Sequence, residues 1–358
     1  METILSLFGS CLPCFPDLSN PVIKIKGNKY KIVKLLGEGG FSYVYLVTQG
    51  NSQASYALKK IRCPYGGNDE SYKQGLKEIR NYHRFTASQT PYIIQSIDEV
   101  IINEVDGSRT IYILLPYFEK SLQDIINNLV LDNQSMPEST ILKIFVGICR
   151  GLKVMHGFKQ TQVNHVDQEE EDDALLPLSE DEDQPTINSV NDTELYELCP
   201  YAHRDLKPAN IMISTEGLPV IVDLGSTSKA RLSIKNRQQA LTLTDFASEH
   251  CSLPYRAPEL LDVITGSEIT EKTDIWSLGC LLYCCCFQFS PFEKLEIDQG
   301  ANLNVAISQG KYIIPGDHQY SSELIQIIHD CLQLDPEKRP QVDDLIDRTL
   351  ELSRQQNF

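Results

Sequence analysis

The sequence is short of positive charge, and the shortage is concentrated in one segment. It contains 32 Lys and Arg against 49 Asp and Glu, a formal net charge of −17. Residues 167–197 hold thirteen of these acidic residues and no basic one, and the rest of the chain carries only −4. We therefore expect neither a nucleic-acid partner nor a strongly acidic body.

Long apolar runs and a secretory signal are also missing. No apolar run approaches the roughly 20 residues that a membrane-spanning helix needs. The eleven cysteines occur in unlike contexts, and Cys284–Cys286 are consecutive, which prevents their all pairing with one another. A chain of reduced thiols on the cytosolic side is the expectation.

The first third of the chain is rich in predicted strands. Residues 1–28 form a proline-containing leader with little periodicity. Residues 29–115 then give a strand, a glycine turn, two more strands, a helix over 69–86, and two strand-like runs within 92–118. We expect a small β-rich lobe over residues 29–115.

The remainder, residues 116–353, is predominantly helical, and residues 354–358 form a short tail. Apolar spacing predicts a helix running to Met155, with further helices around 274–287 and 322–334. Residues 157–198 interrupt this pattern with an acidic, aromatic-poor stretch. Such a composition buries too little apolar surface to offset its ordering entropy, so we expect a disordered insert.

Three short motifs carry the chemistry. Residues 203–210 read HRDLKPAN, residues 223–225 read DLG, and residues 257–259 read APE. In this order they correspond to the catalytic loop, the metal-binding turn and the end of the activation segment of a protein kinase. They predict an α+β fold of two lobes, the smaller rich in strands and the larger helical.

Phosphoryl transfer requires mainly positioning and neutralisation of phosphate charge. Asp205 would accept a hydrogen bond from the substrate hydroxyl, and Lys207 would steady the transferring phosphoryl group. Asn210 and Asp223 would hold Mg²⁺, which prefers amide and carboxylate oxygen. Leu224 stands where a phenylalanine is usual and is still apolar.

Nucleotide binding is predicted in the β-rich lobe. A glycine turn lets backbone N–H groups approach phosphates, although Ser42 replaces the usual third glycine. Lys59 would hold the α- and β-phosphates, with Glu78 as its partner and Glu70 as the rival. The hinge would be 116–118. The residues expected to bind ATP are Gly37, Glu38, Gly39, Gly40, Phe41, Ser42, Val44, Ala57, Lys59, Leu115 and Met212.

The kinase resemblance implies structural roles for three more residues. Glu259 and Arg339 match the buried ion pair that anchors the activation segment. Asp274 matches the carboxylate that braces the catalytic-loop backbone. Substituting any of them should impair activity through geometry.

Residues 37–44 (GEGGFSYV), 239–246 (QALTLTDF) and 251–259 (CSLPYRAPE) make the chain similar to the Numb-associated kinase family. They resemble its small lipid-anchored branch, and the acidic insert favours the yeast vacuolar-membrane type. The resemblance implies Ser/Thr specificity, which Lys207 supports. It also implies an extra helix over 240–250.

The same resemblance concerns the activation segment. Ser252 takes the place of the residue that usually touches the catalytic Asp and Lys. Arg204 precedes the catalytic Asp, an arrangement often controlled by an activation-segment phosphate. Ser248, Thr242 and Thr244 are the candidate acceptors.

Membrane attachment is a hypothesis for the leader. Glu2 excludes an N-terminal myristoylation signal. Cys11 and Cys14 lie among apolar residues, and S-palmitoylation of both would hold the protein on the cytosolic face of a vacuolar, lysosomal or Golgi membrane, because one acyl chain binds only marginally. The alternatives are two ordinary thiols, or a zinc or redox pair that lacks a second matching pair.

An active Ser/Thr kinase that uses ATP and Mg²⁺ on protein substrates is the leading hypothesis. A pseudokinase scaffold is the binding-module alternative, and it usually lacks at least one of Lys59, Asp205, Asn210 and Asp223. A lipid or small-molecule kinase is disfavoured by the APE segment. The acidic insert is either a solvated spacer or a docking element for a basic partner.

Overall fold

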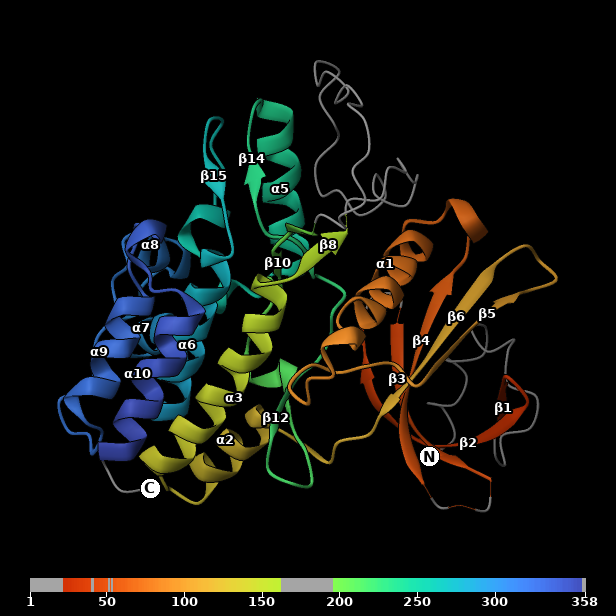
Figure 1. The fold of residues 1–358 in the computed structure, drawn as a ribbon, viewed down its shortest axis with the longest axis horizontal. Coiled ribbons are helices and arrows are strands. Elements are labelled where there is room, and N and C mark those ends of the chain that lie inside the picture. Colours follow the sequence, from red (N-terminus) through yellow and green to blue (C-terminus); the bar gives the residue numbers. More distant parts are fainter. Residues whose placement is uncertain (1–21, 40–41, 51, 53, 162–195, 356–358) are drawn as a thin grey trace, which may run out of the picture. The chain divides into compact units, whose positions relative to one another are not determined.

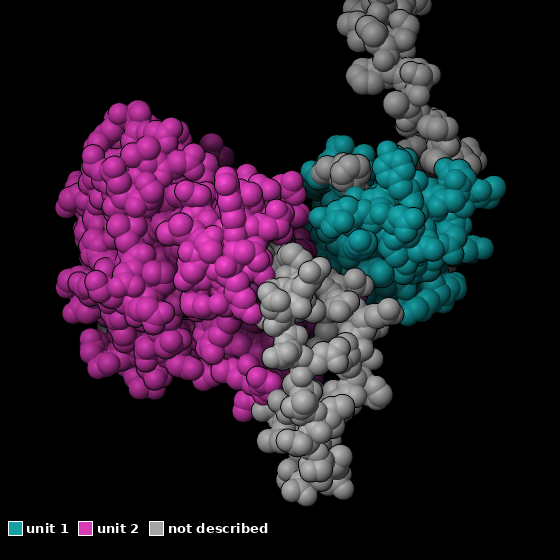
Figure 2. Space-filling view, turned by 90° about the horizontal axis from the view of Figure 1, so that it is seen from above, with its two compact units in different colours: residues 1–79, 95–117 teal, residues 80–94, 118–358 magenta. Residues whose placement is uncertain are grey.

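The computed structural model describes residues 22–39, 42–50, 52, 54–161 and 196–355. They divide into unit 1, residues up to 79 with 95–117, and unit 2, residues 80–94 with those from 118 onward, shown in teal and magenta in Figure 2. Unit 1 is rich in strands and unit 2 in helices, which confirms the predicted fold class.

The division differs from the expected lobes at residues 116–117, which belong to unit 1, and at residues 80–94, which belong to unit 2. This segment belongs to the helical unit because its apolar side chains pack there. Phe85 packs edge-to-face on Tyr201, and Ile93 forms a parallel bridge with Ile221. A chain segment can thus lie between two stretches of the small lobe in sequence and still belong to the large one in space.

Unit 1 is a six-stranded antiparallel sheet with the order β1-β2-β3-β4-β6-β5 (Figure 1). Ile25, Tyr30, Val47 and Leu58 belong to the buried cluster on one of its faces. Its strands are β1 (Val22–Ile25), β2 (Asn28–Glu38), β3 (Ser42–Gln49), β4 (Ser55–Cys63), β5 (Asp98–Asn103) and β6 (Arg109–Pro116).

Helix α1 (Glu70–Arg84) corresponds to the helix expected over 69–86, is slightly shorter at both ends, and packs closely on the sheet. A Cβ at Gly75 would lie 2.6 Å from Cδ1 of Ile111 and 3.2 Å from Cδ1 of Ile61. Glycine at this position therefore lets the helix backbone approach β4 and β6.

The expected leader over 1–28 is wrong at its end, because residues 22–25 form strand β1. Lys26 and Gly27 make the two-residue turn to β2, with φ values of 43° and 90°. Two successive positive φ values fit the hairpin turn whose twist matches the strands. Residues 1–21, with Cys11 and Cys14, lie outside the described residues.

Unit 2 is built around α6 (Lys272–Phe287), which packs against α3, α7 and α9. A Cβ at Gly279 would lie 2.6 Å from Cβ of Cys331, so the missing side chain allows α6 and α9 to come close. The helices expected around 139–155, 274–287 and 322–334 correspond to α3, α6 and α9. The other helices are α2 (Leu122–Leu131), α3 (Glu138–His156), α5 (Arg237–His250), α7 (Pro291–Gln299), α8 (Leu303–Ser308), α9 (Ser322–Cys331) and α10 (Val342–Gln355).

Short strands complete unit 2 and flank the predicted catalytic motifs. They are β7 (Lys120–Ser121), β10 (Tyr201–Ala202), β11 (Ile211–Ile213), β12 (Pro219–Ile221), β13 (Ser228–Lys229), β14 (Leu232–Ser233) and β15 (Glu268–Ile269).

Among the described helices, none is by itself long and apolar enough to cross a membrane. The pair α6 and α7 passes on length and composition together, but it is bent by 58°. All of 272–286 is buried within unit 2. The nine described cysteines are free thiols.

The expected disordered insert over 157–198 is too long at both ends. β8 (Lys159–Thr161) pairs antiparallel with β9 (Tyr196–Leu198), which places Thr161 opposite Tyr196. Phe158 supports this pair by packing edge-to-face on Phe85 and Tyr201. Residues 162–195 lie outside the described residues, so disorder there stays a prediction.

Candidate active site

The catalytic-loop backbone is fixed by one buried carboxylate at the start of α6. Asp274 accepts hydrogen bonds from the backbone N–H groups of His203 at 2.8 Å and Arg204 at 2.9 Å. Its Oδ2 also lies 3.0 Å from Nε2 of His156. Burial alone would raise the pKa of Asp274, but the hydrogen bond and charge of His156, with smaller contributions from His203 and the Arg204 N–H, hold the pKa below its ordinary value.

The residues predicted to act on the hydroxyl are brought together in unit 2. Lys207 Nζ donates to Asp205 Oδ2 at 2.8 Å and to Ser252 Oγ at 2.7 Å. The Ser252 N–H donates to Asp205 Oδ1 at 2.8 Å. Both carboxylate oxygens are thus held in a defined orientation, and Ser252 makes the two contacts that the resemblance implied.

Asn210 joins this network as a donor. Its side-chain amide nitrogen donates to the Asp205 carbonyl oxygen at 2.9 Å and to Asp205 Oδ2 at 3.0 Å. An amide whose N–H groups point to one residue presents its oxygen in another direction. Asn210 can therefore serve as an oxygen ligand without giving up its contact with Asp205.

Asn210 and Asp223 together offer the amide and carboxylate oxygens that Mg²⁺ prefers. Asp223 has φ 60°, a left-handed conformation that Asp tolerates better than most residues. Among the described residues, no group of three or more His, Cys, Asp or Glu is placed so that it could hold a metal ion by itself. A Mg²⁺ that takes its remaining ligands from phosphate and water needs no such group, so the donor set fits.

Sequence reasoning missed Asn81, which is buried near the end of α1 and holds the metal-binding turn. Its side-chain amide donates to the carbonyl oxygens of Leu224 at 2.9 Å and Thr227 at 3.0 Å. The available signal was its position three residues after Glu78, because residues three apart share a helix face.

Arg204 is occupied by its own activation segment. Its guanidinium donates to Ser228 Oγ at 2.8 Å and to the carbonyl oxygens of Lys229 at 2.8 Å and Ala230 at 3.3 Å. Burial lowers its pKa below the ordinary value. Its Nη1 is buried without a hydrogen-bond partner among the described residues, so the guanidinium keeps one unsatisfied donor group.

The three candidate phosphate acceptors differ in their surroundings. The Thr244 hydroxyl donates to the Ala240 carbonyl and accepts from the Val263 N–H, so it fastens α5 to the following segment. Ser248 is exposed, and Thr242 is half-buried.

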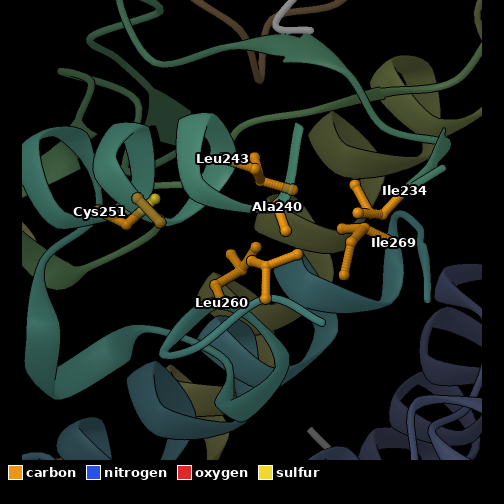
Figure 3. Close-up of a cluster of buried hydrophobic side chains, with 8 residues drawn as sticks. Ile234, Ala240, Leu243, Cys251, Leu260 and Ile269 are labelled. Carbon is orange, nitrogen blue, oxygen red and sulfur yellow. The ribbon is translucent and has the colours of Figure 1, made fainter. Parts of the chain in front are cut away.

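Helix α5 begins at Arg237, three residues earlier than the helix expected over 240–250, because Asn236 caps it by accepting from the Gln239 N–H. Its inner face forms a buried cluster (Figure 3). The members labelled there are Ile234, Ala240, Leu243, Cys251, Leu260 and Ile269.

The predicted ion pair between Glu259 and Arg339 is present. Arg339 Nη1 lies 2.6 Å from Glu259 Oε1, and Nη2 lies 2.8 Å from Oε2. Arg339 is 1% exposed and also donates to the carbonyls of Gln333 and Lys272. The activation-segment end is thereby tied to the loop that precedes α10.

In unit 1, Lys59 pairs with Glu78 and not with Glu70. Lys59 Nζ lies 2.7 Å from Oε1 and 2.8 Å from Oε2 of Glu78, which is buried on α1. Glu70 is the first residue of that helix. Glu78 occurs two turns later, on the face that packs against the sheet.

The predicted adenine-binding residues of unit 1 share one sheet face. Ala57 is the direct cross-strand partner of Leu115, and Val44 is the direct partner of Lys59; Leu46, which was not predicted, is the partner of Ala57 on the other side. These positions alternate with the buried cluster residues, so they present the opposite face. Met212 lies in β11 of unit 2, opposite Val220 and Ser121.

The glycine turn closes through a hydrogen bond from the Gly39 N–H to the Ser42 carbonyl at 2.8 Å. A Cβ at Gly39 would lie 3.1 Å from Ser42 Oγ, whereas one at Gly37 would meet nothing within 4 Å. Gly39 is thus the glycine with a steric reason. Gly40 and Phe41 lie outside the described residues, and Glu38 ends β2.

Comparison with known proteins agrees with this arrangement. The chain matches the protein kinase domain over residues 30–171 and 195–350, and the gap falls within the acidic stretch. It is 40% identical to Serine/threonine-protein kinase ENV7 of Saccharomyces cerevisiae, covering 97% of this chain and 98% of that protein. It is 38% identical to Serine/threonine-protein kinase ppk13 of Schizosaccharomyces pombe (92% of each) and 31% identical to human Serine/threonine-protein kinase 16 (90% of each).

A β-rich unit with a Lys–Glu pair and a helical unit with an oriented Asp–Lys–Asn set define a phosphotransferase of the kinase type. The chain belongs to the protein kinase family, and within it to the serine/threonine protein kinases.

Proposed function

We propose that this kinase is catalytically active and transfers the γ-phosphate of Mg·ATP to Ser and Thr hydroxyls of protein substrates. The observation that carries the proposal is the network in which Lys207 and Ser252 fix both oxygens of Asp205. Asp205 accepts the hydrogen bond of the incoming hydroxyl and orients its oxygen for attack on the γ-phosphorus. Lys207 supplies positive charge where negative charge develops.

Mg²⁺, when bound, would neutralise phosphate charge, and Asn210 and Asp223 are the residues that would hold it. Lys59 would bind the α- and β-phosphates, oriented by its ion pair with Glu78. A pseudokinase usually lacks at least one of four residues, and all four are present here: Lys59, Asp205, Asn210 and Asp223. A scaffold that binds ATP without transfer is therefore the weaker reading.

The test is transfer of radiolabelled phosphate to a generic protein substrate by the wild type and by Asp205→Asn. Asparagine preserves the shape of the side chain and removes the carboxylate. Loss of positioning and proton acceptance should lower the rate by roughly 10²–10⁴-fold. Equal rates in both proteins, or no Ser/Thr product from the wild type with ATP bound, would contradict activity through this site.

We further propose that the protein belongs to the small lipid-anchored branch of the Numb-associated kinase family. Acylation of Cys11 and Cys14 would hold it on the cytosolic face of a vacuolar, lysosomal or Golgi membrane. The activation-segment sequence and the apolar residues around the two cysteines support this. Replacing both cysteines with serine should move the protein from the membrane pellet to the supernatant, and continued pelleting would count against it.

The acidic segment is proposed to be a spacer, with docking of a basic partner as the second candidate. The interruption of the kinase-family match between residues 171 and 195 supports an addition to the catalytic fold. Deleting residues 162–195 should leave phosphate transfer unchanged. If the deletion raises the KM for a basic protein substrate, docking by the acidic segment is favoured.

A further inference from the structure

The start of unit 1 concentrates positive charge in a chain that is otherwise acidic. Residues 22–37 contain five lysines and no Asp or Glu. All five, Lys24, Lys26, Lys29, Lys31 and Lys34, are exposed on β1, β2 and the turn between them.

The register of the hairpin places three of these lysines on one face. Lys24 is the direct partner of Lys29, and Val22 is the direct partner of Lys31. Direct partners in an antiparallel pair point to the same side of the sheet. We call Val22, Lys24, Lys29 and Lys31 the lysine face, and Ile25 and Tyr30 fill the buried cluster on the other side.

This arrangement works against folding. Like charges directly opposite each other destabilise a strand pair. Within the described residues, none of the three lysines of this face has an ion pair to offset the repulsion, whereas Lys26 in the turn pairs with Asp98 at 2.5 Å. Lys24 lies on β1, the edge strand of the sheet, where a lysine also discourages pairing with another chain. Lys29 and Lys31 lie on the inner strand β2, where this reason does not apply, so an external anionic partner is the better explanation for the three together.

The position of the lysine face in the chain indicates which anionic partner. The 21 residues that precede β1 join it at Val22, which is itself 52% exposed on this face. They contain Ile4, Leu5, Leu7, Phe8, Leu12 and Phe15 and no Lys or Arg. An apolar stretch that ends at a cationic face has the chemistry of a bilayer boundary, where acyl chains lie behind charged headgroups.

The lysine face is separate from the nucleotide-binding residues. Lys31 is paired with Thr48 on β3, and Thr48 is four residues from Val44. Four residues of strand span about 13 Å. Substituting these lysines should therefore leave the KM for ATP unchanged.

We propose that the lysine face binds the anionic phospholipid headgroups of a membrane surface. The proposal deepens the membrane location proposed above, but it does not require acylation. Each lysine near an anionic surface strengthens partitioning by roughly fivefold, so three should contribute on the order of 100-fold at low salt. Because the attraction is screened over about 10 Å at 0.1 M salt, it should weaken sharply at higher ionic strength.

The test uses the full chain with Cys11 and Cys14 replaced by serine, so that no acyl chain contributes. Sedimentation is measured with vesicles of phosphatidylcholine alone and with 30% phosphatidylserine added, at about 0.05 M and 0.5 M salt. The test variant carries Lys24→Gln, Lys29→Gln and Lys31→Gln. The matched control carries Lys120→Gln, Lys143→Gln and Lys311→Gln, which are exposed lysines of unit 2.

We expect binding only to the phosphatidylserine vesicles, loss of most of it at high salt, and a reduction on the order of 100-fold in the test variant alone. Equal binding by test and control variants would overturn the proposal. Vesicle binding that appears only after deletion of residues 162–195 would show that the acidic segment is the partner of the lysine face, and it would also overturn the proposal. So would a raised KM for ATP in the test variant.

Phosphate transfer in solution separates this proposal from the proposed function. The test variant should phosphorylate a soluble substrate at the wild-type rate, which also shows that it is folded. Failure of vesicle binding with activity intact rejects the lysine face alone, and absence of activity in the wild type rejects the catalytic proposal alone.

Discussion

Asn81 donates a 2.9 Å hydrogen bond from its side-chain amide to the carbonyl oxygen of Leu224. Asn81 thus holds the turn that contains Asp223 within unit 2. Asn81→Leu preserves volume but removes the donor to both carbonyls: Leu224 still accepts from the Thr227 N–H at 3.2 Å, whereas the Thr227 carbonyl loses its Asn81 donor, which costs about 1–3 kcal/mol if it stays buried. We expect kcat to fall about tenfold and the Mg²⁺ concentration for half-maximal rate to rise.

The measurement is kcat against Mg²⁺ concentration for wild type, Asn81→Leu and Asn128→Leu. Asn128 is an exposed residue of α2 and controls for the added apolar side chain. A variant with lower thermal stability but unchanged Mg²⁺ dependence would show that Asn81 is structural only.

Ser252 contacts Lys207 through its hydroxyl and Asp205 through its backbone N–H. Ser252→Ala removes only the first contact, so Lys207 keeps Asp205 as a partner but loses its second restraint. We expect kcat to fall by about tenfold, the cost of one charge-assisted hydrogen bond. Ser252→Thr keeps the hydroxyl and should recover most of the rate. Equal losses in both variants would indicate that crowding, and not the hydrogen bond, is responsible.

Arg339 would be left as an uncompensated buried cation in Glu259→Ala, because its side chain is fully enclosed. Breaking a buried pair from one side typically costs 3–5 kcal/mol, so we expect a large fall in the free energy of unfolding. Asp298→Asn breaks the exposed pair with Lys294 on α7 and should cost no more than about 0.5 kcal/mol. Chemical denaturation of both variants gives the comparison, and similar losses would refute the assigned burial.

The buried thiols should make the protein sensitive to alkali. Burial raises the pKa of Cys63 to about 11 and that of Cys284 and Cys331 to about 12. A thiol with a raised folded-state pKa contributes stability that is complete below its unfolded pKa, about 8.5, and is lost as pH rises through the folded value. We expect the thermal midpoint to decrease between about pH 9 and 12.

Thiol labelling provides the check on the same groups. At pH 8 the folded protein should react slowly at these positions and rapidly after denaturation, because the thiolate is the reactive form. Rapid labelling of Cys284 in the folded protein would contradict its burial.

Much of the catalytic set was predictable because its members lie close together in sequence. Asp205, Lys207 and Asn210 are within six residues, so their spacing alone predicts a shared site. The Lys59–Glu78 pair needed one further step, the choice between two glutamates on one helix. The fold class followed from strand-rich and helix-rich halves.

The contacts that were missed depend on residues far apart in sequence or on backbone atoms. Asn81 bonds carbonyls more than 140 residues away, and a carbonyl leaves no signature in the sequence. Arg204 likewise donates to the carbonyl oxygens of Lys229 and Ala230, and the identity of those residues does not reveal such a contact. Strand β1 escaped prediction because four residues after several prolines are too few to establish an alternating pattern.

The pairing of Thr161 with Tyr196 has a consequence for the chain's history and for its engineering. Because β8 and β9 pair with each other, the catalytic fold requires only that these two strands meet, whatever sequence joins them. Doubling the length of such a loop costs only about 0.6 kcal/mol of closure entropy. The segment between β8 and β9 should therefore tolerate changes in length and sequence during evolution. A reporter domain inserted there should leave the rest of the enzyme unchanged.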